Sequence, residues 1–318
     1  MRKILVSILL LILGMVPFFA LAGKTEGDRP NFIFILTDDH NYSDLGCNGN
    51  ELIQTPNLDK LAAEGTRFTN GHITSAICTP SRISILLSQF ERKHGVNFNS
   101  GTSVAPEAWN MSYPMVMRRN GYYTGYVGKN HAPVGEGGYN GGLMDASFDY
   151  WYAGHGHLTF YPKDRHKIFK QSEHNTQVEI LGEGVTDFLS KEHVIPGAEH
   201  FLESRPKDQP FVLSLCLNVP HGSSTSSMKL KESDPELYRS AYREMEIPMP
   251  PNYIAKADIK TPKLPPEIHF TKDRQTIYNS VDTPQSNRER IIRTMQTVTG
   301  VDRLVGNLLD TLKESGLD

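Results

Sequence analysis

The sequence predicts an α/β fold in which helices cover both faces of a mostly parallel central sheet. Three apolar runs of strand length indicate the sheet: Asn31–Thr37, Tyr122–Val127 and Phe211–Leu217. A nearly continuous apolar run is typical of a parallel strand that is covered on both faces. Gly121, a helix stop signal, precedes the second run. The length of 318 residues and the hydrophobic content of 38% are sufficient to form such a core.

Charged or titratable side chains follow each of these runs. Asp38 and Asp39 come directly after the first, Lys129 and His131 after the second, and His221 after the third. Ligands of open α/β sheets bind in the crevice outside the carboxyl ends of the strands. We therefore expect these three separate parts of the chain to converge on one site.

The segment Cys78-Thr79-Pro80-Ser81-Arg82 predicts the start of a helix. With Cys78 or Thr79 as the N-cap and Pro80 as the first helical residue, the missing proline N–H costs nothing. Cys78 would lie where unpaired backbone N–H groups and the helix dipole attract sulfate or phosphate. Arg82, four residues on, would reach a tetrahedral oxyanion there with two N–H groups. The buried face would consist of Ile83, Leu86 and Leu87.

Each of these features also has an ordinary structural interpretation. Aspartates such as Asp38 and Asp39 often cap a turn. Lys129 and His131 could be ordinary residues of an exposed loop. Cys78 could be a buried, inert thiol. Adjacent carboxylates repel each other, however, unless a cation lies between them, and their hard oxygens suit Ca²⁺ or Mg²⁺. The common location of all these residues favours a functional site.

Five motifs together resemble the type I sulfatases of the alkaline phosphatase superfamily, from about Arg29 to the end of the chain. They are R-P-N-F-I-F-I-L-T-D-D-H, T-P-N-L-D-K-L-A-A-E-G-T-R-F-T-N, C-T-P-S-R, G-K-N-H and V-P-H. The resemblance implies that a dedicated maturase oxidises Cys78 to formylglycine, an aldehyde that hydrates to a geminal diol. It also implies that Asp38 and Asp39 bind Ca²⁺ together with residue 78.

The same resemblance implies a reaction and a role for each remaining site residue. One hydroxyl of the diol attacks sulfur, the alcohol leaves, and loss of the second hydroxyl's proton expels sulfate. His131 would hydrogen-bond the diol and take its proton. The sulfate oxygens would be held by three further residues, Arg82, Lys129 and His221.

The final segment, Val301–Leu317, has one apolar helical stripe and a stop signal at Gly316. In members of the sulfatase family the next element is a strand with further metal ligands, followed by a lysine and a small C-terminal sheet subdomain. We therefore expect a catalytic domain that is truncated before its last core strands. A site with two carboxylates would bind Ca²⁺ weakly, because this ion takes about six to eight oxygens. A fragment, a truncated gene product and an inactive derivative all fit this pattern.

The N-terminus predicts export to the periplasm or the extracellular space. Met1-Arg2-Lys3, an apolar run from Ile4 and a small-residue site ending at Ala22 form a secretory signal peptide over residues 1–22. The catalytic domain would then occupy residues 23–318. An uncleaved membrane anchor is the alternative, because the apolar run is long for a signal peptide.

Composition restricts the remaining possibilities. The net charge of −3 argues against a nucleic-acid surface. Cys47 and Cys216 could form a disulfide or stay buried as thiols. Residues 222–285 are rich in proline and charge and suit a substrate wall or lid. Tyr161 could contact substrate, whereas His155 and His157 suit an ordinary loop because their spacing is not that of metal ligands.

These observations predict a sulfuric ester hydrolase that removes sulfate from a sulfated carbohydrate or related ester. A phosphodiesterase or phosphonate hydrolase of the same superfamily is one alternative, since it can share the fold, the carboxylates and a formylglycine. An inactive, truncated binding protein is the other.

Overall fold

The structure is a computed structural model that describes residues 29–99, 102–154, 158–161, 176–179, 193, 196–221, 232, 234–254, 258 and 283–317. The predicted signal peptide lies outside the described residues, as do His155, His157 and most of the predicted insertion over residues 222–285. No helix in the described part of the chain is long and apolar enough to cross a membrane.

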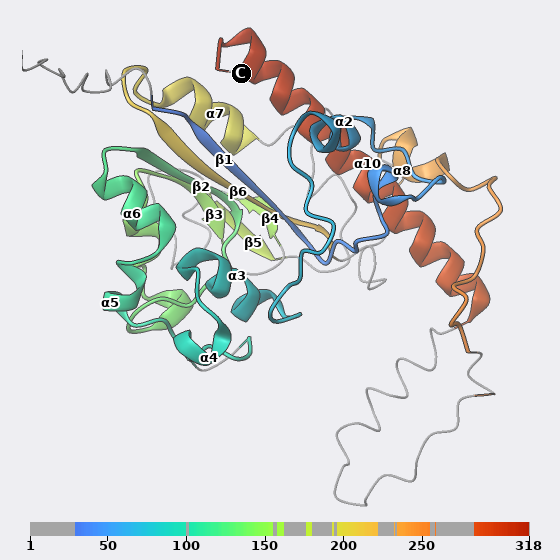
Figure 1. Ribbon diagram of the computed structural model, residues 1–318, viewed down its shortest axis with the longest axis horizontal. Coiled ribbons are helices and arrows are strands. Elements are labelled where there is room, and N and C mark those ends of the chain that lie inside the picture. The colour runs from blue at the N-terminus through green and yellow to red at the C-terminus, as the bar shows by residue number, and fades with distance from the viewer. Residues whose placement is uncertain are drawn as a thin grey trace, which may run out of the picture.

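The centre of the molecule is a parallel sheet with the strand order β1-β6-β2-β3 (Figure 1). The predicted fold class is confirmed, and the three predicted strands are β1, β2 and β6. β3 was not predicted. Its sequence Tyr-Trp-Tyr-Ala-Gly is short and aromatic, and β2 pairs with it through Gly125–Lys129. The strands of this sheet are β1 (Phe32–Asp38), β2 (Tyr123–Lys129), β3 (Tyr150–Gly154) and β6 (Phe211–Pro220). A separate antiparallel pair consists of β4 (Leu158–Tyr161) and β5 (Thr176–Glu179).

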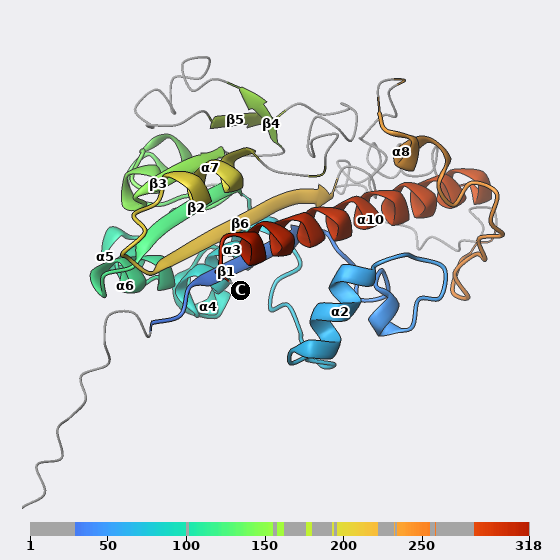
Figure 2. The same cartoon turned by 90° about the horizontal axis from the view of Figure 1, so that it is seen from above.

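Helices cover both faces of the sheet. The α helices are α2 (Pro56–Glu64), α3 (Cys78–Leu87), α4 (Glu91–His94), α5 (Pro106–Trp109), α6 (Tyr113–Arg119), α7 (Pro196–Ser204), α8 (Glu236–Ser240) and α10 (Pro284–Glu314). Short 3₁₀ turns are η3 (Gly46–Asn48), η4 (Gly138–Asn140) and η5 (Asp145–Ser147). α10 runs alongside β6 (Figure 2).

Alternate residues of the central strands contribute to two separate cores. Leu213 and Leu215 of β6 pack in one core with α7 and α10, whereas Cys216 packs in the other with α3. This alternation follows from the period of two along a strand. Because both faces are covered by helices, the strands are apolar throughout, as the sequence predicted.

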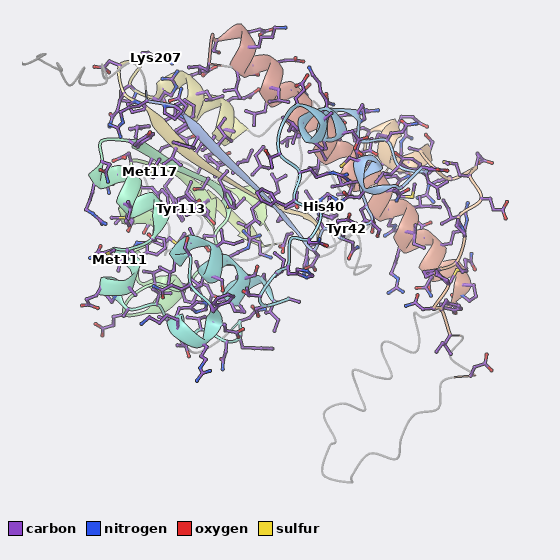
Figure 3. The ribbon with its side chains drawn as sticks, viewed as in Figure 1. His40, Tyr42, Met111, Tyr113, Met117 and Lys207 are labelled. Atoms are coloured by element: carbon purple, nitrogen blue, oxygen red, sulfur yellow. The ribbon has the colours of Figure 1, made fainter. Side chains whose placement is uncertain are left out.

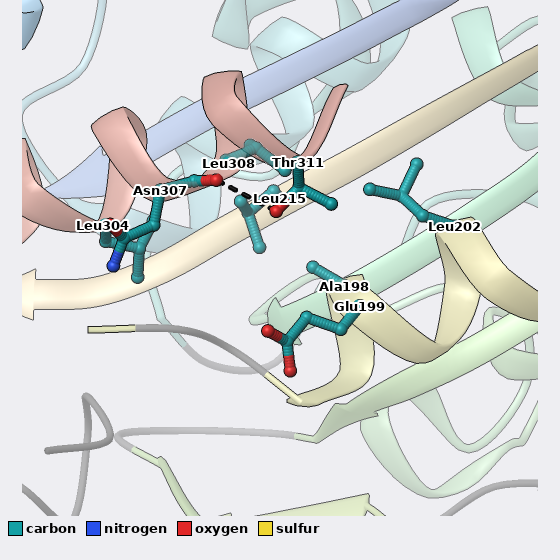
Figure 4. A pocket seen from close by; sticks show the side chains of 8 residues that line it. All are labelled: Ala198, Glu199, Leu202, Leu215, Leu304, Asn307, Leu308 and Thr311. Carbon is teal, nitrogen blue, oxygen red and sulfur yellow. Dashed lines mark hydrogen bonds between the residues drawn. The ribbon is translucent and has the colours of Figure 1, made fainter. Parts of the chain in front are cut away.

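The contact of α7 with α10 over β6 contains a small apolar cavity of about 20 Å³ (Figure 4). Such a space accommodates about one water molecule, so we interpret it as a packing gap. Thr311 donates a hydrogen bond of 2.9 Å to the Asn307 carbonyl at its rim. Its lining residues are Ala198, Glu199, Leu202, Leu215, Leu304, Asn307, Leu308 and Thr311.

α3 starts earlier than predicted. Ile77 is its N-cap, and Cys78 is the first helical residue, so Pro80 occupies the third helical position. The predicted N-cap at Cys78 or Thr79 was therefore wrong. Proline is tolerated here because the N–H groups of the first helical turn have no intrahelical partner. The ladder begins with the Ser81 N–H, which donates to the Ile77 carbonyl at 3.0 Å. The predicted buried face, Ile83, Leu86 and Leu87, is confirmed.

α10 starts at Pro284, well before the predicted Val301. The Thr283 side chain accepts the Ser286 N–H, and proline occupies the first turn, which together define a capped start. The predicted range ended at Leu317, whereas the helix ends at Glu314, and Gly316 adopts a left-handed φ of 65°. The predicted stop signal at Gly316 is therefore confirmed.

Neither of the two cysteines left open by the sequence forms a disulfide. Cys47 is a half-buried free thiol, and Cys216 is a buried free thiol. Cys216 belongs to the core that contains α3.

Gly128 allows β2 and β6 to approach closely just before the site. Its φ is 101°, and a Cβ atom there would lie 2.1 Å from the Cys216 carbonyl oxygen. We expect Gly128→Ala to destabilise the fold more than Gly49→Ala. Gly49 has a similar φ of 95°, but a Cβ atom there would have no other atom within 4 Å. Left-handed strain costs about 1–2 kcal/mol in both variants, and only Gly128→Ala adds a clash with backbone. Equal losses of unfolding free energy in urea would contradict this explanation.

Candidate active site

The three predicted strand ends converge at one edge of the sheet. Asp38 is the last residue of β1, Lys129 is the last residue of β2, and His221 directly follows β6. The Asp38 Cα pairs with that of Pro220, and the His221 N–H donates to the Asp38 carbonyl at 2.9 Å. His40 and Tyr42 lie just beyond this end of β1 (Figure 3). The parallel arrangement explains the convergence, because all carboxyl ends point the same way.

Asp38, Arg82 and Lys129 form a buried charge cluster. Their side chains are 5%, 3% and 0% exposed. Lys129 Nζ donates to Asp38 Oδ2, and Arg82 Nη2 lies 3.7 Å from the same oxygen. Arg82 also donates to the Lys129 carbonyl at 3.0 Å and to the Leu217 carbonyl at 3.3 Å. Arg82 thereby connects the ends of β2 and β6.

The surroundings of Asp38 and Arg82 favour the charged form of each side chain. Burial opposes ionisation of Asp38, but Arg82 and Lys129 outweigh burial and lower the pKa of this carboxyl. Burial also opposes the charge of Arg82, but Asp38 raises the pKa of the guanidinium above its usual value. One carboxylate therefore faces two cations, and the excess positive charge suits an anionic ligand.

Cys78 and His131 form the second part of the site. The Cys78 Sγ lies 3.0 Å from His131 Nδ1 and 3.4 Å from Asn99 Oδ1. Cys78 is the first residue of α3 and is half-buried, so its thiol is at the positive end of the helix. His131 has a left-handed φ of 43° and stacks on Tyr139 with a centroid distance of 5.7 Å. An imidazole nitrogen, which donates or accepts according to its tautomer, is thus held against the side chain at position 78.

His221 and Asp39 form the third part. His221 Nε2 lies 3.4 Å from Asp39 Oδ2, and the Asp39 side chain is 49% exposed. Burial and the Lys129 charge lower the pKa of His221, although Asp38 and Asp39 act in the opposite direction. The lowered pKa favours the neutral imidazole, which can provide one N–H donor.

Three contact residues of the site were missed by sequence reasoning. Asn99 Oδ1 accepts the Thr79 N–H at 3.2 Å, and the Tyr139 hydroxyl is 2.8 Å from Thr79 Oγ1. The Tyr126 hydroxyl donates to the Lys129 carbonyl at 2.9 Å. None of the three belongs to a motif, so no sequence signal marked them.

The two aspartates provide part of a site for a hard cation. Both are carboxylates at the strand edge, and the lowered pKa of Asp38 keeps it ionised. In the described ranges, no three His, Cys, Asp or Glu side chains form a cluster that could hold a metal ion. Two carboxylates are fewer than the roughly six to eight oxygens that Ca²⁺ takes, so other oxygens would have to complete a cation site at this edge.

Comparison with known proteins gives a consistent family assignment. The family described as Sulfatase matches residues 30–318. An N-acetylglucosamine-6-O-sulfatase of Bacteroides thetaiotaomicron is 32% identical over 202 residues, which cover 62% of this chain and 32% of the relative. Arylsulfatase G of Homo sapiens is 40% identical over 136 residues, which cover 42% of this chain and 25% of the relative. The chain thus matches about a third or less of the length of these relatives.

Solved structures share the fold at low sequence identity. One, described as a complex with its substrate D-glucosamine-2-N,6-O-disulfate, has a TM-score of 0.59 and 21% identity over 91% of this chain and 63% of its own. The phosphonate monoester hydrolase of Agrobacterium radiobacter has a TM-score of 0.61 and 15% identity over 91% of this chain and 60% of its own. With the family match extending over residues 30–318, the chain belongs to the sulfatase family.

Proposed function

We propose that this chain carries the nucleophile and sulfate-binding part of a sulfuric ester hydrolase that acts on a sulfated carbohydrate or related ester. The observation that carries the proposal is the contact of 3.0 Å between His131 Nδ1 and Cys78 Sγ, at the sheet edge that also holds the buried Asp38, Arg82 and Lys129. The names of the relatives, which include an N-acetylglucosamine-6-O-sulfatase, support a sulfated sugar as the substrate class.

Position 78 would act as formylglycine, formed from Cys78 by a maturase. When present, this group supplies a hydrated aldehyde, whose hydroxyl is the nucleophile and whose second hydroxyl provides a route for sulfate release. His131 Nδ1 is within hydrogen-bonding distance of the side chain at position 78 and would accept the hydroxyl proton. Asn99 Oδ1 contacts the same side chain and would orient it.

Arg82, Lys129 and His221 would bind the sulfate group. The positive excess of the buried cluster is already arranged by the protein, so it needs little reorganisation as negative charge develops on the sulfate oxygens and the leaving oxygen. Beside these two cations, neutral His221 would provide a further hydrogen-bond donor to the sulfate group. Arg82 is held by two backbone carbonyls, which fixes its guanidinium plane.

Asp38 and Asp39 would bind Ca²⁺, in preference to Mg²⁺, together with the oxygen of the matured residue 78. A bound Ca²⁺ supplies positive charge that favours ionisation of a nearby hydroxyl and neutralises the transferred group. Asp39 is the more accessible of the two carboxylates: its side chain is 49% exposed, although it lies next to His221.

Replacement of Asp39 with alanine is expected to weaken Ca²⁺ binding by about tenfold or more, because a hard cation loses one of few charged ligands. The unfolding free energy should change by less than about 0.5 kcal/mol, since the side chain is half-exposed. Isothermal titration with CaCl₂ measures the affinity, with the exposed Asp208→Ala as the control. Equal Ca²⁺ affinity in both variants would refute the ligand assignment.

The proposed function is tested by producing the chain together with a formylglycine-generating maturase. Mass spectrometry of the peptide that contains Cys78 should show the aldehyde, whereas the peptides with Cys47 and Cys216 should keep their thiols. Hydrolysis of 4-nitrophenyl sulfate should accompany the conversion at a low rate, because two carboxylates alone bind Ca²⁺ weakly. A thiol at position 78 in every molecule, or an aldehyde without any sulfate release, would contradict the proposal.

A phosphonate or phosphodiester hydrolase is the second candidate function. The fold shared with the phosphonate monoester hydrolase of Agrobacterium radiobacter favours it, and a tetrahedral phosphonate would meet the same cations. Parallel assays with an aryl sulfate, an aryl phosphonate and an aryl phosphodiester separate the two functions by the larger kcat/KM.

We also propose that the chain is exported to the periplasm or beyond, with residues 1–22 removed as a signal peptide. The charged start, apolar run and Ala20-Leu21-Ala22 site support this. N-terminal sequencing of the exported protein should begin at Gly23. A start at Met1 in membrane fractions would instead support the uncleaved anchor.

A further inference from the structure

A groove of about 500 Å³ lies next to the turn that follows Asp38 and Asp39. The loop after β1 forms one wall with Asn41, and the segment 247–254 and the first half of α10 form the others. Its volume is within the range of about 300–1,000 Å³ that is typical of small-molecule sites. None of the residues that we assign to sulfate, metal or nucleophile lines it, so it is a separate site adjacent to the first.

The polar lining of the groove suits hydroxyl groups. Asn41 donates to Asp44 Oδ2 at 3.0 Å, and both residues line the groove. Asn50 accepts the Leu52 N–H at 3.0 Å and donates to the Ser43 carbonyl at 2.8 Å, which fixes its amide in place. Amides and carboxylates of this kind combine donors and acceptors, as the neighbouring hydroxyls of a sugar ring require.

The same groove has an apolar and aromatic component. Tyr253 lines it, with its N–H held by the Pro250 carbonyl at 2.8 Å. Leu52, Ile291 and the buried Met295 add apolar surface. An apolar surface with a few placed polar groups is the usual composition of a ligand site, and it matches the C–H faces of a sugar ring.

Arg290 provides the groove with a cation. Its guanidinium is half-buried and donates to Asn287 Oδ1, and no carboxylate of the described residues pairs with it. The neighbouring Glu289 is held instead by Arg243 and Arg293, each at 2.9 Å. Arg290 therefore keeps further N–H donors for an anionic oxygen, and its planar fork matches sulfate or carboxylate.

We propose that this groove binds a second, anionic sugar residue of an oligosaccharide whose neighbouring residue enters the sulfate site. Arg290 would contact the sulfate or carboxylate of that second residue, Asn41 and Asp44 its hydroxyls, and Tyr253 its apolar face. This inference rests on the proposed function for the choice of sugar. It makes the substrate a chain of at least two anionic residues, rather than a single sulfated sugar.

The test compares a long ligand with a short substrate that reaches only the sulfate site. Binding of a heparin-derived tetrasaccharide is measured by calorimetry, and hydrolysis of 4-nitrophenyl sulfate is measured in the same matured full-length preparations. We expect Arg290→Gln and Tyr253→Ala each to raise the tetrasaccharide Kd by about tenfold, as loss of a hydrogen bond to a charged group or of an apolar contact does. Turnover of the aryl sulfate should stay unchanged.

Arg303→Gln is the matched control, because Arg303 is an exposed arginine of the same helix that does not line the groove. An equal loss of affinity in Arg290→Gln and Arg303→Gln would overturn the inference, since it would indicate general charge attraction. Unchanged affinity in Arg290→Gln, or no tetrasaccharide binding by the unaltered protein, would overturn it as well. Tetrasaccharide binding that depends on Arg290 without any aryl sulfate turnover would support the groove and contradict the proposed function.

Discussion

Replacement of Lys129 with methionine is expected to lower the unfolding free energy by about 3–5 kcal/mol, the usual cost of removing one partner of a buried ion pair. Lys129 is 0% exposed and contacts Asp38, which is 5% exposed. Methionine nearly fills the space of the lysine stem, so the main loss is electrostatic: Asp38 would lose its contacting cation and keep the more distant Arg82, at 3.7 Å. Urea denaturation followed by circular dichroism measures the change.

Two further variants separate the charge effect from packing. Lys93→Met, an exposed lysine of α4, should change stability by less than about 0.5 kcal/mol. The double variant Lys129→Met/Asp38→Asn should lose less stability than the sum of the two single variants, because both single changes remove the same Lys129–Asp38 contact. Strictly additive losses would show that packing, and not the ion pair, dominates.

Acid should remove the contribution of Asp38 in a defined direction. The pKa of Asp38 is lowered below its ordinary value of 3.8, so its stabilising contribution is present above pH 3.8 and is lost as the pH falls through the folded-state pKa. Asp38→Asn should therefore reduce the pH dependence of the unfolding free energy below pH 3.8. An unchanged slope in that range would contradict the assignment.

Replacement of Cys78 with alanine is expected to reduce aryl sulfate turnover by at least about a thousandfold, because it removes the group from which the nucleophile is formed. Fold should be retained, since Cys78 is half-buried at the first position of α3 and alanine is compatible with a helix. The rate is measured on matured protein with 4-nitrophenyl sulfate and compared with Cys47→Ala, which alters another half-buried free thiol. Residual activity above a few per cent of the original would exclude Cys78 as the nucleophile position.

The predictions for Lys129 and Cys78 distinguish two kinds of contribution within the site. Under the proposed function, Lys129 would contribute to both stability and anion binding because its side chain is buried, whereas Cys78 would contribute chemistry and little packing. His131 belongs with Cys78, since its ring is held by Tyr139 and contacts the side chain at position 78. Loss of His131 should therefore affect kcat and its pH profile, and leave the unfolding free energy largely intact.

Strand positions were predictable because the evidence for them is local. The runs before Asp38, before Lys129 and before His221 correspond to β1, β2 and β6, since a strand covered on both faces must be apolar throughout. Boundaries were less predictable. α3 begins at Cys78 because a helix accepts proline through its first turn, and α10 begins at Pro284 because the local cap at Thr283 outweighs the polar composition that follows.

The sequence by itself determined the α/β class, the sulfatase motifs and the meeting of Asp38, Lys129 and His221 at one sheet edge, because strand period, turn chemistry and parallel topology act over short stretches of chain. Only the tertiary structure decided which charges share a contact. It placed Lys129 on Asp38 and enclosed the pair, which lie 91 positions apart. It also brought Asn99 to the Cys78 thiol and assembled the groove around Arg290 from three distant segments. Such contacts depend on how remote elements pack, and spacing along the chain does not encode that.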